Sequence, residues 1–194
     1  MSMSMSEKEK ALAGLLYNGA FDEELLNDRN RCKELCSEYN KLKPSQMEER
    51  TEIIKKLFGK TGDGFLIEQT IWCDYGYNIE IGENFYSNHN IVILDCAKVK
   101  FGKNCFIAPN CGFYTAGHPL DAEQRISGLE YAKPITVGDN VWIGANVTVL
   151  PGVSIGNNTV IGGGSVVTKD IPDGVLAYGN PCRVIRKLTE EDRM

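Results

Sequence analysis

The chain has 194 residues, of which 42% are hydrophobic, and a mean hydropathy of -0.24, which suits one soluble domain with or without a small appendage. Its 21 basic and 26 acidic side chains give a formal net charge of -5. This balance supplies no basic field for a phosphate backbone, so we expect no nucleic-acid partner. The first ten residues lack the apolar run of a signal peptide, and no stretch of about 18 apolar residues follows. We therefore expect a cytoplasmic protein with no membrane contact.

Residues 7 to about 58 have the spacing of amphipathic helices. Breakers at Asn18-Gly19 and Pro44 divide them into three apolar patterns. Ser45 and Glu48 have the spacing of a capping box that opens the last helix. One face of the middle helix carries Leu25, Cys32, Leu35, Cys36 and Tyr39. We interpret residues 1–60 as a helical cap and residues 61–194 as a second domain.

Beyond residue 70 the period changes to six residues. Apolar residues recur six apart at Val137, Ile143, Val149, Ile155, Ile161 and Val167, and small or β-branched residues follow each by four, at Val141, Val147, Val153, Thr159, Ser165 and Ile171. The positions three after each apolar residue are Asn140, Asn146, Gly152, Asn158, Gly164 and Asp170. Asn, Asp and Gly tolerate a left-handed backbone best, so these positions predict corners.

The same pattern extends upstream, with corners at Asn84, Asn90, Asn104 and Asn110. Such a repeat predicts short strands that turn every six residues, with three strands closing one triangular coil of a parallel β-helix. The charged stretch at about 114–133 interrupts the pattern, and we expect it to leave the array as an extended loop. The ends of the stack need caps, which the N-terminal helices and the C-terminal tail could supply.

The repeat Ile143-Gly144-Ala145-Asn146-Val147 resembles those of the hexapeptide-repeat acyltransferases. Further motifs narrow the resemblance to the maltose and galactoside O-acetyltransferases: Asp74-Tyr75-Gly76, Asn84-Phe85-Tyr86-Ser87-Asn88, Gly117-His118-Pro119-Leu120, Gly138-Asp139-Asn140-Val141-Trp142 and Val167-Thr168-Lys169-Asp170-Ile171-Pro172. The resemblance implies a left-handed β-helix, acetyl-CoA as co-substrate without a required metal, and a sugar hydroxyl as acceptor. It also implies a homotrimer with its active sites at the subunit interfaces.

Transfer of an acetyl group to a hydroxyl requires a base that titrates near neutral pH, and histidine is the side chain that fits. The chain has two histidines, His89 and His118. The resemblance places the catalytic base at His118; the alternative interpretation of His118 is a solvated loop histidine. We interpret His89 as a packing or surface side chain. The resemblance also places Asn88 beside the base, where it would hydrogen-bond the acceptor. The alternative interpretation of Asn88 is a corner residue of the repeat.

The resemblance also implies the ligand-binding positions. A backbone N–H near Ala145 would stabilise the oxyanion, since charge develops on the carbonyl oxygen during attack. The acetyl-CoA positions are Ala145, Gly163, Thr168, Lys169, Arg183 and Arg186, the last three near the phosphates. Asp74 and Tyr86, with Asn88, match positions that line the sugar pocket. Cys96 stands where some galactoside-acetylating members have a second carboxylate, although Asp95 precedes it.

Other functions fit parts of the pattern. An N-acetyltransferase of an amino sugar, amino acid or antibiotic needs nearly the same base, and a β-helix can serve as a non-catalytic scaffold. A zinc hydratase with three histidine ligands is disfavoured because the chain has two histidines. The seven cysteines form no CxxC pair, which indicates small buried apolar residues instead of a disulfide framework or zinc ribbon. Cys105 and Cys111 occupy inward repeat positions and are poor nucleophiles.

Overall fold

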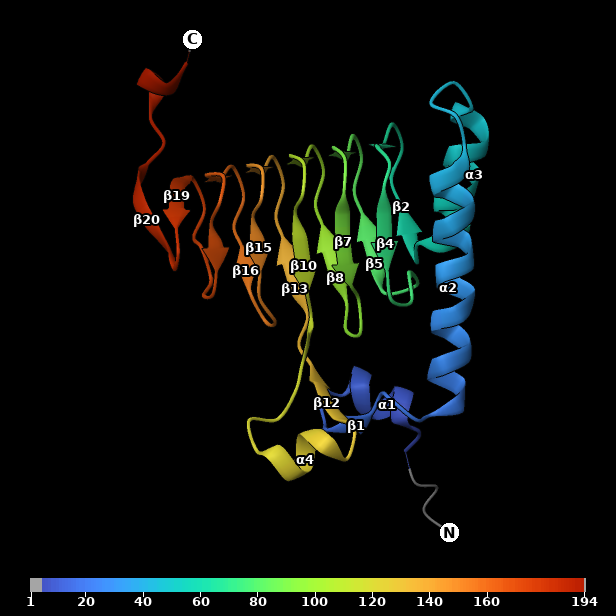
Figure 1. Cartoon of the computed structure of the whole chain (residues 1–194). Coiled ribbons are helices and arrows are strands. Elements are labelled where there is room, and N and C mark those ends of the chain that lie inside the picture. Colours follow the sequence, from blue (N-terminus) through green and yellow to red (C-terminus); the bar gives the residue numbers. More distant parts are fainter. Residues whose placement is uncertain (1–4, 194) are drawn as a thin grey trace.

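The computed structural model describes residues 5–193 and places three helices before the β-helix (Figure 1). These are α1 (Glu7–Leu12), α2 (Glu23–Lys41) and α3 (Met47–Leu57), as the apolar patterns predicted. Ser6 and Glu9 form a capping box on α1, and the Asp22 carboxylate caps α2. The expected capping box of Ser45 and Glu48 is wrong. Because α3 begins one residue later, its N-cap is Gln46, which makes no side-chain capping bond.

Short parallel strands form the three faces of a left-handed parallel β-helix, as predicted. The first face contains β2 (Lys60–Thr61), β5 (Ile79–Ile81), β8 (Val99–Phe101), β13 (Ile135–Val137) and β16 (Ser154–Ile155). The second contains β3 (Leu66–Ile67), β6 (Tyr86–Ser87), β9 (Phe106–Ile107), β14 (Trp142–Ile143), β17 (Val160–Ile161), β19 (Val175–Gly179) and β20 (Cys182–Lys187). The third contains β4 (Ile71–Cys73), β7 (Ile91–Leu94), β10 (Gly112–Tyr114), β15 (Thr148–Val149) and β18 (Val166–Val167). Each coil passes through the first, second and third faces in turn.

The main core is a cluster that runs from the helices through the coils, and a smaller second cluster packs residues of α1, β1 (Tyr17–Asn18) and β12 (Leu129–Ala132) against the coils. All six predicted inward residues from Val137 to Val167 are buried, each with at most 2% of its surface exposed. Three phenylalanines stack inside the upstream coils: Phe101 lies 5.0 Å from Phe85 and 4.8 Å from Phe113, measured between ring centroids. The helices α2 and α3 cover the open end of the first coil, and β20 pairs antiparallel with β19 at the other end. Both ends of the stack are therefore capped.

Asparagine builds most of the corners. The backbone φ is positive at Asn84, Asn104, Asn140 and Asn158, between 52° and 56°, and their side chains form a ladder of amide hydrogen bonds of 2.8 to 3.0 Å. Asn90, Asn110, Asn146, Gly152 and Gly164 are also left-handed, as predicted. Asp170 is the exception. Its φ is not positive, and its carboxylate instead accepts a hydrogen bond from the Ser154 amide at 2.8 Å, because the last coil is irregular after β18.

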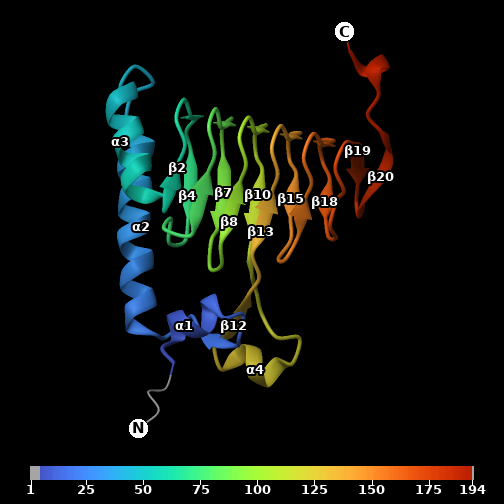
Figure 2. The ribbon, with the colours of Figure 1, turned by 180° about the vertical axis from the view of Figure 1, so that it is seen from behind.

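The stretch at 114–133 leaves the edge between the third and first faces, as expected (Figures 1 and 2). It contains β11 (Ala116–Gly117), the short helix α4 (Ala122–Ile126) and β12 (Leu129–Ala132). The strand β12 pairs antiparallel with β11 and with β1 (Tyr17–Asn18), which precedes α2. The N-terminal segment therefore holds the base of the excursion.

The outward side chains differ among the three faces. The first face presents Lys60, Glu80, Lys100, Thr136 and Ser154, which is a polar row. The second presents the apolar row Leu66, Tyr86, Phe106, Trp142, Val160 and Leu176. Phe106 and Trp142 are 53% and 55% exposed. The third presents Trp72, Val92, Gly112, Thr148 and Val166. Within residues 5–193 no helix has the length and apolar character needed to cross a membrane.

Substitution of Asn140 tests the corner interpretation. In Asn140→Ala a residue with a Cβ keeps the left-handed φ of 56°, but no side-chain amide offsets the steric cost. The substitution also breaks the asparagine ladder. We expect a destabilisation of about 1–2 kcal/mol, whereas Asn140→Gly keeps the left-handed backbone without strain and costs less. Chemical unfolding of both variants at one protein concentration measures the difference. Equal losses for Ala and Gly would contradict a backbone origin.

Candidate active site

Asn88, Ala145 and Gly163 lie on the edge between the second and third faces. Each follows a strand of the second face, and these strands are aligned in register as Ser87, Ile107, Ile143 and Ile161. The Gly164 amide donates to the Ala145 carbonyl at 2.8 Å, so consecutive coils stack directly. The candidate oxyanion donor and a candidate cofactor position thus share one edge with Asn88.

Glycines let the backbones of consecutive coils approach closely around Ala145. A Cβ added to Gly144 would lie 2.5 Å from the Gly163 nitrogen, and one added to Gly163 would lie 3.0 Å from the Ala145 oxygen. Among residues 5–193 no acceptor engages the Ala145 amide. A half-exposed backbone N–H without an internal partner can donate to a ligand, which is what an oxyanion hole requires.

His118 lies on a different edge, the one between the third and first faces, directly after β11. Its side chain is exposed, and Nδ1 stands 3.3 Å from the Leu129 carbonyl oxygen. A carbonyl only accepts hydrogen bonds, so Nδ1 carries the proton in the neutral ring. The lone pair is then on Nε2, which is left to accept a proton.

A cluster of polar side chains lies at the same edge. The Cys96 thiol donates to the Asp74 carboxylate at 3.4 Å, and the Tyr17 hydroxyl donates to Glu130 at 2.9 Å. Glu130 follows Leu129, the residue that holds His118. Burial raises the pKa of Asp74, and burial together with the Asp74 charge raises the pKa of Cys96.

Tyr17, Glu130 and Arg29 were missed by the sequence analysis. Arg29 donates to the Tyr75 hydroxyl at 2.7 Å and to the Gly19 carbonyl at 2.6 Å, and its charge acts on Asp74. Apart from the Gly19 contact, these contacts join segments 46 to 113 residues apart. No local motif could signal them, because they depend on the pairing of β1 with β12 and on the packing of α2 against the first coil.

Asp95 is fully buried and holds the turn that carries Asp74. Its carboxylate accepts hydrogen bonds from the amides of Asp74, Tyr75 and Asn78, at 3.0, 2.8 and 3.3 Å. With 0% of its surface exposed it is closed to an acceptor. Cys96, the next residue, is the one whose side chain contacts the Asp74 carboxylate. Burial raises the pKa of Asp95 to about 7, despite the amide hydrogen bonds that favour its charged form.

The remaining candidates are distributed along the stack. Tyr86 lies in the apolar row of the second face, 6.4 Å from Phe106 between ring centroids, and not beside Asp74. Thr168 and Lys169 are exposed directly after β18, on the edge that carries His118. Within one chain they are therefore on a different edge from Ala145 and Gly163.

The two arginines lie on β20 at the end of the stack. Arg183 is opposite Tyr178, and its guanidinium donates to the Cys182 carbonyl at 2.9 Å. Arg186 instead forms a two-contact ion pair with Asp192, at 2.8 and 2.5 Å. The charge of Arg186, one of the positions expected near the phosphates, is thus offset by an acidic residue that follows it.

Comparison with known proteins matches residues 10–62 to the family model described as the maltose acetyltransferase hexapeptide capping motif, and residues 134–169 to the bacterial transferase hexapeptide model with six repeats. The galactoside O-acetyltransferase of Escherichia coli K12 is 46% identical over 191 residues, which cover 98% of this chain and 94% of that protein. The chain belongs to the maltose and galactoside O-acetyltransferase family.

Solved structures of this family have the same architecture. A maltose O-acetyltransferase from Clostridium difficile 630 superposes with a TM-score of 0.94, at 50% identity, over 97% of this chain and 100% of that chain. A galactoside acetyltransferase in complex with coenzyme A also gives a TM-score of 0.94, at 46% identity, over 97% and 94% of the two chains. This family member is therefore an acetyltransferase of the maltose and galactoside type.

The buried carboxyl of Asp95 predicts a pH dependence of stability in this family member. Its pKa is raised in the folded state, so its protonated form is stabilising at low pH and that contribution is lost as the pH rises through about 7. Asp95→Asn keeps the shape but cannot ionise. We expect the stability of wild type relative to this variant to fall by about 2–4 kcal/mol between pH 4 and 8. Urea unfolding at both ends of this range measures it, and a difference that does not change with pH would contradict the buried-carboxyl account.

Proposed function

We propose that this protein transfers the acetyl group of acetyl-CoA to a hydroxyl of a sugar, with His118 as the general base. The observation that carries the proposal is the contact of His118 Nδ1 with the Leu129 carbonyl, which leaves Nε2 free as a proton acceptor on an exposed ring. The related proteins named for maltose and galactosides, and the coenzyme A bound to one of them, support the acceptor class and the co-substrate.

The proposed reaction is a direct transfer within a ternary complex. The sugar hydroxyl oxygen attacks the thioester carbonyl while Nε2 of His118 takes its proton, and the Ala145 amide donates to the developing oxyanion. Collapse of the tetrahedral intermediate breaks the carbon–sulfur bond, and the imidazolium returns the proton to the leaving thiolate. The products are the acetylated sugar and free coenzyme A.

Acetyl-CoA would lie along the edge between the second and third faces. Ala145 and Gly163 stack there in consecutive coils, and Arg183 follows at the end of the stack, where it suits a phosphate. Arg186 can contribute only by exchanging its Asp192 partner. Thr168 and Lys169 would reach the cofactor from a neighbouring subunit, because they are on another edge of their own chain.

Each complete site would therefore contain two chains. Asn88 and Ala145 are on one edge, and His118 with Asp74 is on another, so one triangular coil cannot bring them together. The second and third faces are mostly apolar outside, whereas the first is polar. Association of neighbouring chains around a threefold axis would bury apolar side chains of these rows and place an edge of one chain beside an edge of the next at three equivalent sites.

Replacement of His118 tests the proposed base. We expect His118→Ala to bind acetyl-CoA as wild type does but to lose roughly 10²- to 10⁴-fold in turnover, the usual scale for removal of a general base. Release of the coenzyme A thiol, followed with a panel of sugars and small amines, measures turnover and distinguishes O- from N-acetylation.

The control is His89→Ala, which removes the chain's other histidine. His89 is also exposed and also contacts a backbone carbonyl through Nδ1, that of Gln69 at 2.5 Å, so the two variants are closely matched. We expect His89→Ala to retain turnover within a few-fold of wild type. A large loss in His89→Ala, or near-normal turnover in His118→Ala, would overturn the assignment.

A further inference from the structure

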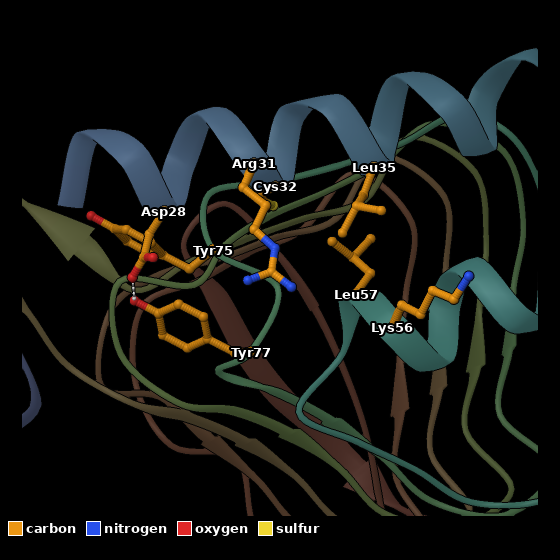
Figure 3. A pocket seen from close by; sticks show the side chains of 8 residues that line it. All are labelled: Asp28, Arg31, Cys32, Leu35, Lys56, Leu57, Tyr75 and Tyr77. Carbon is orange, nitrogen blue, oxygen red and sulfur yellow. Dashed lines mark hydrogen bonds between the residues drawn. The ribbon is translucent and has the colours of Figure 1, made fainter. Parts of the chain in front are cut away.

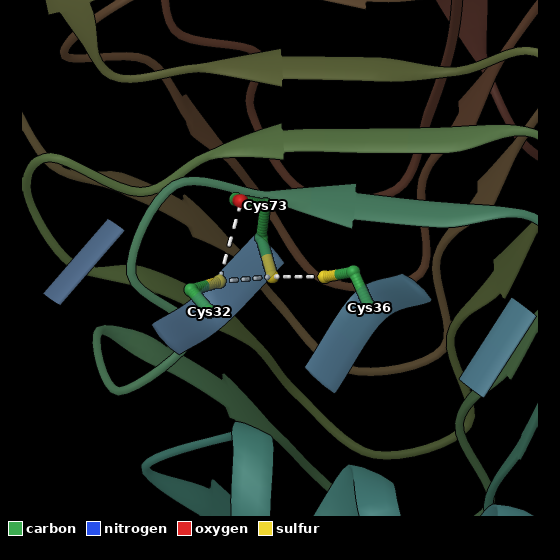
Figure 4. A group of neighbouring side chains, drawn as sticks. All are labelled: Cys32, Cys36 and Cys73. Carbon is green, nitrogen blue, oxygen red and sulfur yellow. Dashed lines mark hydrogen bonds between the residues drawn. The ribbon is translucent and has the colours of Figure 1, made fainter. Parts of the chain in front are cut away.

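Three cysteine thiols meet between the helical cap and the first coil (Figure 4). Cys32 and Cys36 are one turn apart on α2, and Cys73 ends β4. The Cys73 sulfur is 3.4 Å from that of Cys32 and 3.6 Å from that of Cys36, and all three sulfurs lie within 4.8 Å of one another. All three residues are buried.

This spacing suits a three-coordinate ion. A metal about 2.3 Å from each of three sulfurs in one plane requires them to be about 4 Å apart, close to the observed separations. Residues 5–193 contain no other group of three or more cysteine, histidine or carboxylate side chains with converging ligand atoms, and no fourth such side chain joins this one. The charge of Asp95 raises the pKa of Cys32. The Asp95 carboxylate, however, is occupied by hydrogen bonds from backbone amides.

The number and type of ligands select the kind of ion. Structural zinc sites use four ligands in a tetrahedron, whereas soft thiolates without other donors favour Cu(I).

A cavity of about 130 Å³ borders the cluster on the side of Cys32 (Figure 3). It lies between α2, the end of α3 and the turn after β4, and Cys32 is part of its wall. The other lining residues are Asp28, Arg31, Leu35, Lys56, Leu57, Tyr75 and Tyr77. Arg31 and Lys56 put two positive charges beside a site that becomes anionic when the thiols ionise, and Asp28 offsets one of them.

We propose that Cys32, Cys36 and Cys73 form a binding site for a soft three-coordinate metal ion, for which Cu(I) is the probe. Each thiol that coordinates the ion loses its proton to solvent, and no sulfur changes oxidation state. The ion would tie α2 to β4, one residue before Asp74, and so fasten the cap to the first coil. This role is independent of the transfer reaction.

Anaerobic titration of the full-length reduced protein with Cu(I), against a chromophoric Cu(I) chelator, tests the site. We expect one tightly bound Cu(I) per chain and a higher melting temperature than that of the metal-free protein. X-ray absorption at the copper edge should show three sulfur neighbours at about 2.3 Å. Cys36→Ser and Cys32→Ser should each weaken binding by at least about tenfold, since even changes outside the ligand set act on that scale.

The matched control is Cys111→Ser. Cys111 is also buried, its thiol donates to the Gly144 carbonyl at 3.2 Å, and the equivalent repeat position is a buried serine at Ser165. We expect this variant to fold and to keep one Cu(I) per chain. Coenzyme A binding checks the fold of every variant. Should the cluster variants not fold, the sulfur count in the wild-type absorption spectrum still decides the question.

Four results with the reduced protein and copper would overturn the proposal. These are Cu(I) affinity unchanged in both cluster variants, loss of the ion in Cys111→Ser, a spectrum without three sulfur neighbours, and a disulfide between two of the three cysteines in place of a bound ion, seen as a loss of two mass units. Tight binding of Zn²⁺ with no Cu(I) binding would equally contradict the choice of a three-coordinate site.

Discussion

The left-handed backbone at each corner is the constraint on which the rest of the structure depends. The left-handed conformation is sterically unfavourable for most L-residues. Asn or Gly, for which it costs less, occurs at six-residue intervals along the coils. At Asn84, Asn104, Asn140 and Asn158 the side-chain amides also bond from coil to coil, so the residue that permits the turn also aligns the stack. With the corners aligned, every strand of a coil lies on a strand of the next, and each residue has a fixed face or edge.

That alignment separates the groups proposed for acetyl transfer. Ala145 lies on one edge, where no acceptor within residues 5–193 engages its amide, whereas His118 is carried by the strand pair that leaves another edge. The N-terminal strand β1 supports the second group through Tyr17 and Glu130, so the cap and the excursion together shape the surroundings of the proposed base. A rigid triangular coil cannot bring these edges together, and association with a second chain is the arrangement that would.

Much of the fold follows from local sequence. The six-residue spacing predicted the inward residues, and nine of the ten corners that it predicted are left-handed, because both depend on properties of single residues in a regular repeat. Asp170 departs because the repeat is already ending there, and Ser45 because α3 starts two residues after it, at Met47, with Gln46 as the N-cap. The contacts of Arg29 with Tyr75 and of Cys32 with Cys73 could not be predicted, since they join distant segments through the packing of α2 on the first coil. The motifs were enough to name the candidate residues. That these residues lie on two different edges of the coil could be seen only from the strand register.

The most direct test of a site shared by two chains is a mixture of two variants that each lack one proposed site residue and that we expect to be inactive when alone. His118→Ala removes a group from one edge and Asn88→Ala a group from the other, and co-assembled chains can join the intact edge of each. For random threefold assembly at equal amounts, about a quarter of the sites would hold both native residues, so we predict recovery of about a quarter of wild-type turnover. Turnover no greater than the average of the two separate variants, in mixed trimers confirmed by mass, would contradict the account.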